Sequence, residues 1–120
     1  MNGAPSLRSA IPILRVYDWA VARAFYVDFL GCAVDWEHRY APDLPLYMQV
    51  SRDDMVLHLS EHHGDGTPGT AVWIRTDNAR ALFAELGARQ ARFARPDMDR
   101  DAATLTDPFG NMLRFDGARD

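Results

Sequence analysis

Two stretches of the chain repeat one arrangement of apolar and polar positions. Each has a short apolar run that ends in aspartate, then a segment with helical periodicity, then a glycine: 13–18, 19–30 and Gly31, followed by 72–77, 78–86 and Gly87. Asp18 and Asp77 stand where helix N-caps accept hydrogen bonds from free amides, and the two glycines stand where helices end. The repetition predicts two copies of one module.

Apolar residues at helical spacing follow each aspartate and predict which helix face is buried. The predicted stripe of the first helix is Ala20, Ala24, Val27 and either Leu30 or Gly31, flanked by Val21, Phe25 and Phe29. That of the second helix is Ala79, Leu82, Phe83 and Leu86.

Three strand candidates follow each helix, at 33–38, 46–50 and 55–60 in the first half and at 91–94, 103–106 and 112–116 in the second. Residues 51–54 and 107–110 have the composition of tight turns between strands. Each half therefore reads βαβββ. We expect an α+β fold in which tandem βαβββ modules form a cupped mixed sheet with helices on the outer face. The expected divisions are an arm (1–9), the first module (10–61), a linker (62–69), the second module (70–116) and a tail (117–120).

Alternation along the strands separates an aliphatic face, which the helices should cover, from a mixed face. The mixed face carries Arg15, His58, Ser60, Trp73, Arg75 and Arg114. A concave face with a few polar groups is typical of a small-molecule pocket. The same pattern also fits a face that is open to solvent or buried in a dimer.

Composition narrows the class of protein only modestly. Of the 120 residues, 48% are hydrophobic and 25% charged, as in ordinary globular domains. The single cysteine, Cys32, excludes an internal disulfide, and a net charge of -4 gives no reason to expect nucleic acid as a partner. No apolar run approaches the roughly 20 residues of a membrane helix, so we expect no membrane partner and a cytoplasmic location.

Several motifs, taken in order, resemble the vicinal-oxygen-chelate superfamily, which includes glyoxalase I, extradiol dioxygenases and the fosfomycin- and bleomycin-resistance proteins. They are the opening Ile-Pro-Ile-Leu-Arg-Val-x-Asp, the helix Ala24-Phe-Tyr-x-x-Phe-Leu-Gly31 and the closing Asp107-Pro-Phe-Gly-Asn111. The resemblance spans residues 10–115.

The resemblance implies where a metal would bind, because metal-dependent members take one ligand from each of the first, fourth, fifth and eighth strands. Those positions fall on Ile11, His58, Ala71 and Arg114. Only His58 has a donor atom for a metal, and divalent ions need several. We therefore expect no metal and no cofactor. The run from His58 to His63 offers no alternative site, because residues four apart on a strand are separated by roughly 13 Å.

A metal-free member most resembles the bleomycin-resistance proteins, whose dimers hold a drug in two grooves at the subunit interface. That resemblance implies grooves lined here by Trp36, His38, Tyr40, Tyr47, Trp73 and Phe93, with His58 and Arg114 deeper. Arg15, Arg75 and Arg114 would favour an anionic ligand unless nearby acids neutralise them. Pro12, in the predicted first strand, is compatible with exchange of the N-terminal arm between subunits.

The sequence thus predicts a metal-independent protein of the glyoxalase/bleomycin-resistance type, which sequesters a small molecule, such as a glycopeptide antibiotic, in a homodimer groove. It would not be an enzyme. The alternatives are a lyase or dioxygenase of the same superfamily with a shifted metal site, and a metal-free enzyme in which His58 is the general base.

Overall fold

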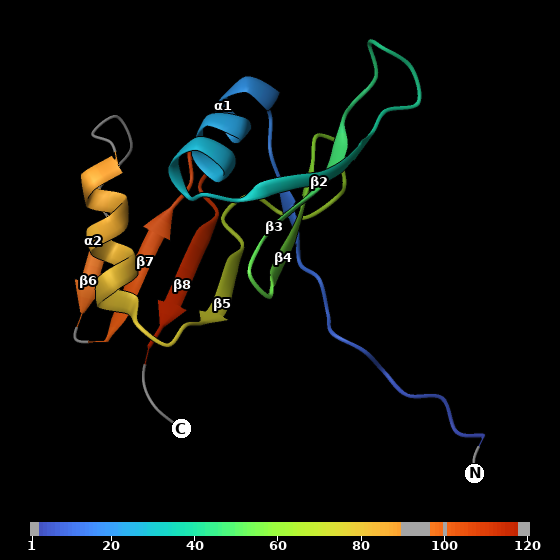
Figure 1. The fold of residues 1–120 in the computed structure, drawn as a ribbon. Helices are drawn as coiled ribbons and strands as arrows, with labels where there is room; N and C mark the ends of the chain where they lie inside the picture. Colours follow the sequence, from blue (N-terminus) through green and yellow to red (C-terminus); the bar gives the residue numbers. More distant parts are fainter. Residues whose placement is uncertain (1–2, 90–96, 100, 118–120) are drawn as a thin grey trace.

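The computed structural model describes residues 3–89, 97–99 and 101–117, which form two four-stranded mixed sheets, one from each half of the chain (Figure 1). The first sheet has the order β1 (Ile13–Arg15), β4 (Met55–Ser60), β3 (Tyr47–Arg52) and β2 (Ala33–His38). The second has the order β5 (Ala71–Arg75), β8 (Met112–Asp116), β7 (Ala102–Thr106) and β6 (Asp97–Asp99). β1 pairs with β4, and β5 with β8, in parallel. The other neighbouring strands pair antiparallel. The expected α+β fold of tandem βαβββ modules is confirmed.

The first helical segment consists of α1 (Trp19–Arg23) and a π-helix, η1 (Ala24–Phe29), rather than one α-helix over 19–30. Asp18 is its N-cap, as predicted, and accepts a hydrogen bond from the amide of Val21 at 3.1 Å. The predicted buried positions were correct at Phe25, Phe29 and Leu30. The prediction was wrong at Ala20 and Val21, which are exposed, and it missed the buried Ala22 and Tyr26. Large rings set the buried face because their burial removes more apolar surface from water than that of alanine.

The second helix, α2 (Ala79–Arg89), differs from the prediction at both ends. Its N-cap is Asn78 and not Asp77, since the amide of Ala81 donates to Asn78 Oδ1 at 3.0 Å. Gly87 lies inside the helix and does not end it. No helix among the described residues is long and apolar enough to cross a membrane.

Two of the predicted strands need correction or stay untested. The strand β3 begins and ends later than predicted, so the turn to β4 consists of Asp53 and Asp54, with Asp53 at φ 53°. The strand predicted over 91–94 lies outside the described residues. The described strand that pairs with β7 at this side of the sheet is β6.

One hydrophobic core joins the two modules. Leu14, Leu57 and Leu59 of the first sheet pack in the same cluster as Leu113 and Phe115 of the second. These are the aliphatic and aromatic positions that strand alternation assigns to the covered face, and both helices lie on that side of the molecule (Figure 1). Among the described residues, the opposite face of each sheet carries exposed side chains, such as Ile13 and Trp73, and we call it the open face. The open face of the first sheet carries the candidate site.

The turn between β7 and β8 also links the modules. Its buried Asp107 accepts hydrogen bonds from the Tyr26 hydroxyl at 2.5 Å, from the amides of Phe109 and Asn111, and from the Asn111 side chain. Burial, followed by the charge of Asp107, raises the pKa of Tyr26 well above its ordinary value. Gly110 lies at φ 93°, a conformation that glycine adopts without strain. The turn that is prominent in the sequence is thus a structural junction.

The segment before β1 runs away from both sheets (Figure 1). Leu7 within it is 99% exposed, and Ile11 is also exposed. Pro12 precedes β1, and its carbonyl accepts a hydrogen bond from the amide of His58 at 3.0 Å. The sequence had placed Pro12 inside the first strand, but Pro12 lies just before it.

Candidate functional site

Aromatic and polar side chains gather on the open face of the first sheet. Opposite residues on β1, β4, β3 and β2 along one row are Ile13, His58, Gln49 and Trp36. The register of β2 shifts between Val34 and Trp36, so that Asp35 is the extra residue of a bulge. The bulge places Trp36 opposite Gln49 and His38 opposite Tyr47. Both aromatic residues of β2 therefore share the open face with β3.

The rings on this face contact one another in a continuous cluster. Trp36 stacks on Tyr47 with centroids 6.0 Å apart and an interplanar angle of 10°, and His58 meets both rings edge-on. Further along, the rings of His38 and Tyr40 lie 4.6 Å apart, and His62 lies 6.4 Å from both Tyr40 and Tyr47.

Together these rings enclose a cavity that we call the aromatic hollow. Its volume is about 500 Å³, and it is lined by Trp36, His38, Tyr40, Tyr47, His62 and Asp65. Trp36 is 43% exposed and Tyr40 76% exposed, so the walls are open to a ligand. Ring faces of this kind stack on planar groups and attract cations.

His58 lies beside the hollow in a hydrogen-bonded chain that crosses three strands. Gln49 Nε2 donates to Asp35 at 3.1 Å, which turns Gln49 Oε1 toward His58 Nε2 at 3.0 Å. His58 Nε2 must therefore carry the proton, and His58 Nδ1 accepts from the Tyr47 hydroxyl at 2.6 Å. Both ring nitrogens of a neutral imidazole are thus used.

The protonation states of this pair follow from burial. Partial burial lowers the pKa of His58, which favours the neutral ring that the hydrogen bonds require. Burial, and secondly the negative charge of Asp65, raise the pKa of Tyr47, so its hydroxyl keeps its proton. The pair is therefore a neutral donor and a neutral acceptor near pH 7.

The linker between the modules contributes one side of the hollow. Ser60 at the end of β4 is fully buried; it donates to Asp65 at 2.8 Å and accepts from the amide of His62 at 3.0 Å. These bonds fix the turn that places His62 and Asp65 against Tyr47. Strand alternation had placed Ser60 on the mixed face, where the pocket was expected. Ser60 instead positions the linker and does not line the hollow.

The remaining predicted site residues are not part of the aromatic hollow. Trp73 is 68% exposed on the second sheet, directly opposite Arg114. Phe93 lies outside the described residues. Arg15 belongs to the first sheet, where it donates to the carbonyls of Val16 and Glu61, so the three arginines are divided between the sheets.

The four positions that correspond to the superfamily's metal ligands can now be placed. Ile11 precedes β1, His58 lies on β4, Ala71 begins β5, and Arg114 lies on β8. Of these, only His58 has a donor atom for a metal, and both its ring nitrogens are engaged. Across the part of the chain that the structure describes, no three His, Cys, Asp or Glu side chains gather as metal ligands would.

The sequence predicted five of the residues that form the aromatic hollow and the hydrogen-bonded chain beside it, and it missed four others. Trp36, His38, Tyr40, Tyr47 and His58 were predicted and lie in contact. Gln49 and Asp35 were missed, although alternation along β3 already put Gln49 on the face of Tyr47. His62 and Asp65 reach the hollow through the fold of a turn-rich linker, for which the sequence has no periodic signal.

Comparison with solved structures supports the fold. A bleomycin-binding protein from the bleomycin producer Streptomyces verticillus, solved with copper(II)-bleomycin, superimposes with a TM-score of 0.76 at 23% identity, covering 97% of this chain and 100% of that one. A bleomycin-binding protein in complex with bleomycin gives 0.70 at 21% identity, with 94% and 100% covered. A bleomycin resistance determinant encoded on the transposon Tn5 gives 0.69 at 20% identity, with 95% and 100% covered.

No curated protein matches the sequence. At identities below one quarter, the structural matches establish a shared fold only. The sequence model described as "glyoxalase superfamily protein", in contrast, matches residues 2–120, which is nearly the whole chain. Both the sequence match and the tandem βαβββ architecture lead to one conclusion: the chain belongs to the glyoxalase superfamily.

Proposed function

We propose that this protein binds and sequesters a small molecule, without a metal and without catalysis, in a groove formed between two copies of the chain. The observation that carries the proposal is the aromatic hollow, with its exposed rings and a volume of about 500 Å³. Ligand pockets for small molecules have volumes of roughly 300–1,000 Å³.

The lining favours a ligand with a flat and cationic part. Five of the six lining residues present aromatic rings, and the sixth, Asp65, is the only carboxylate among the residues that line the hollow. Arg15 is not among the residues that line the hollow; it lines a different cavity, and its guanidinium donates to the carbonyls of Val16 and Glu61. Structural neighbours that bind bleomycin make a glycopeptide antibiotic the first ligand to test.

The chemistry of His58 supports binding without a metal. A metal would need the lone pair that Nδ1 directs to the Tyr47 hydroxyl, and the other three corresponding positions are Ile11, Ala71 and Arg114. The same hydrogen bond weakens the case for His58 as a general base, since the base lone pair already accepts a proton donor. A lyase, a dioxygenase or a metal-free enzyme therefore remains the less favoured alternative.

The dimer is proposed from surfaces that one copy leaves uncovered. Trp73 and Ile13 are exposed on the open faces of the two sheets, and Leu7 is 99% exposed. The segment before β1, to which Leu7 belongs, runs away from both sheets (Figure 1). A second copy would cover these apolar groups and complete the groove around the hollow. We propose that the arm, residues 1–9, crosses to that copy.

A thermal-shift and calorimetric screen tests the proposal. We expect bleomycin-class glycopeptides to raise the melting temperature, because a ligand that binds the native state stabilises it by mass action. Other cationic antibiotics and small carboxylates serve as comparison classes. Trp36→Ala should weaken binding about tenfold through the loss of stacking, whereas Val21→Ala, on the exposed side of α1, should not change it.

Two results would contradict the proposal. If no glycopeptide raises the melting temperature at high concentration, the sequestration proposal fails. Stoichiometric micromolar binding of zinc, nickel, iron(II) or manganese would contradict metal independence.

A further inference from the structure

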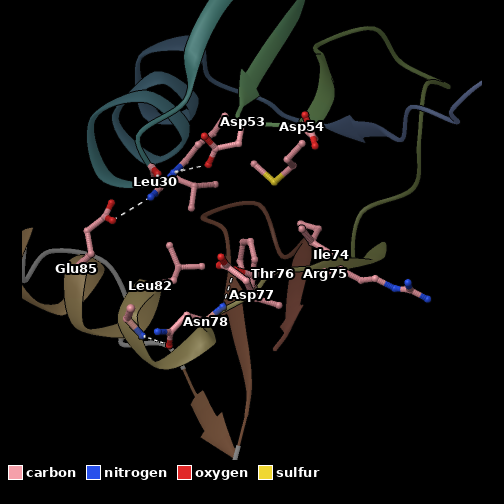
Figure 2. A pocket seen from close by; sticks show the side chains of 14 residues that line it. Leu30, Asp53, Asp54, Ile74, Arg75, Thr76, Asp77, Asn78, Leu82 and Glu85 are labelled. Atoms are coloured by element: carbon pink, nitrogen blue, oxygen red, sulfur yellow. Dashed lines mark hydrogen bonds and ion pairs between the residues drawn. The ribbon is translucent and has the colours of Figure 1, made fainter. Parts of the chain in front are cut away.

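A second cavity lies between the two modules, on the side that the helices cover (Figure 2). We call it the intermodule cleft. Its volume is about 500 Å³, and it lies between the β3–β4 turn, the end of η1, the end of β5 and the first turns of α2. It shares no residue with the aromatic hollow.

The floor of the cleft is apolar. It is formed where the common core reaches the surface, by Leu30, Met55, Ile74, Leu82 and Phe115. Leu30 and Phe115 are buried, whereas Met55, Ile74 and Leu82 are only partly covered. A partly covered apolar floor can bind the hydrocarbon part of a ligand.

The rim of the cleft is acidic. Four carboxylates line it, those of Asp53, Asp54, Asp77 and Glu85, against the two guanidinium groups of Arg52 and Arg75. Asp53 and Asp54 lie on one side of the floor and Asp77 on the other (Figure 2). Within the described residues, neither Asp54 nor Asp77 has a hydrogen bond or an ion pair from its carboxylate.

The positive groups of the rim do not cancel this charge. Arg52 donates to Glu85 at 2.9 Å and to the carbonyl of Leu30 at 2.8 Å, so its charge is already compensated. The side chain of Arg75 runs away from the other labelled side chains (Figure 2). Asp53 lies 4.0 Å from Arg52 Nε, so the uncompensated negative charge of the rim belongs to Asp54 and Asp77. The N-terminus of α2 adds only about half a positive charge against these two carboxylates.

We propose that the intermodule cleft is a second ligand site, which takes an organic cation with an apolar body, such as an ammonium group on an aryl or alkyl chain. The apolar part lies on Met55, Ile74 and Leu82, and the cation lies between Asp54 and Asp77. A ligand bound in this way contacts both modules and stabilises their packing. The site is independent of the function proposed for the aromatic hollow.

Three probes with one apolar body and different charges test the proposal: 4-phenylbutylamine, 4-phenylbutanol and 4-phenylbutyrate. Binding to the ¹⁵N-labelled protein is followed by the amide chemical shifts. We expect shift changes at Met55, Ile74 and Leu82, and an affinity for the amine at least about fivefold above that for the alcohol, with the carboxylate weakest. Shift changes that concentrate at Trp36 and Tyr47 would assign the binding to the aromatic hollow and overturn the proposal.

Charge variants separate a specific cation site from general attraction to an acidic protein. The double variant Asp54→Asn with Asp77→Asn should remove the preference for the amine and leave the affinity for the alcohol unchanged. The control, Asp28→Asn with Asp43→Asn, changes the net charge equally at exposed positions elsewhere and should bind like the parent. Equal losses in both double variants, or equal affinities of the parent for amine and carboxylate, would overturn the proposal.

Discussion

At the scale of single residues, the state of His58 is determined by its neighbours. The Asp35 carboxylate fixes the orientation of the Gln49 amide, the amide fixes the imidazole tautomer, and the tautomer makes the Tyr47 hydroxyl the donor. A hydroxyl whose hydrogen is used in this way presents only its oxygen lone pairs to the aromatic hollow. Tyr47 therefore acts there as a ring for stacking and as a hydrogen-bond acceptor.

Replacing Tyr47 by phenylalanine tests this assignment. The Tyr47 hydroxyl stabilises the neutral imidazole by donating to Nδ1, so Tyr47→Phe should raise the pKa of His58 toward its ordinary value of 6.5. The imidazole NMR signals, titrated between about pH 5 and about pH 8, measure the change. Tyr17→Phe, whose ring packs against Phe109, is the control and should leave His58 unaffected. A lower pKa for His58 in Tyr47→Phe would mean that Nδ1 is the donor.

At the scale of elements, the C-terminal end of η1 is held by arginines from both modules. The carbonyl of Leu30 accepts from Arg52 of β3 at 2.8 Å, and that of Phe29 accepts from Arg89 of α2 at 2.7 Å. The Glu85 carboxylate forms ion pairs with both guanidinium groups, with that of Arg52 at 2.9 Å and with that of Arg89 at 2.7 Å. One carboxylate thus orients the two arginines that satisfy the last carbonyls of the π-helix.

Glu85→Gln should lower the stability of the protein. The ion pairs are about one-third exposed, so water screens them, and we expect a cost of about 1 kcal/mol, or a melting temperature lower by about 4 °C. Thermal unfolding measures the change. Glu37→Gln is the matched control, because its contact with Arg23 is longer, at 3.9 Å, and more exposed.

The same variant has a predicted pH dependence. The hydrogen bond from Arg52 lowers the pKa of Glu85 below its ordinary value of 4.5. The folded state therefore binds fewer protons than the unfolded state near that pH, and the stabilisation is present above pH 4.5 and is lost as the pH falls through the lowered pKa. The parent and Glu85→Gln should converge in stability over that interval, and a constant difference would contradict the mechanism.

The elements also show what a sequence pattern can and cannot predict. Alternation correctly assigned Leu57 and Leu59 to the core and His58 to the open face, since strand parity has a fixed period of two. Helix details were less predictable. Thr76, Asp77 and Asn78 offer several capping side chains in sequence, and only the three-dimensional path of the chain selects Asn78.

The candidate site likewise contains residues that the sequence could predict and residues that it could not. The ring-bearing residues on β2, β3 and β4, namely Trp36, His38, Tyr47 and His58, could be predicted, because each strand repeats a simple pattern. The contribution of the linker could not, because His62 and Asp65 are placed by hydrogen bonds to Ser60 rather than by periodicity. The bulge at Asp35, which sets the register of Trp36, likewise depends on pairing with β3.

At the scale of the whole molecule, the exposed arm and the two open sheet faces predict a homodimer at micromolar concentration. Light scattering coupled to size-exclusion chromatography should give twice the mass of one chain, and deletion of residues 1–9 should shift the protein toward the monomer. Loss of the dimer should also weaken ligand binding, since the proposed groove contains both copies.

Two neighbouring positions of the arm provide the matched comparison. Leu7 is 99% exposed in a single copy, and Ser6 beside it is also exposed. Leu7→Asp should weaken the dimer, because an apolar side chain buried by the partner would be replaced by a charge, whereas Ser6→Asp adds the same charge at a polar position. If both variants remain dimers with unchanged dissociation constants, the arm does not pack on the partner. A parent protein that is monomeric at micromolar concentration would contradict the dimer itself, and the groove would then have to be formed by one chain.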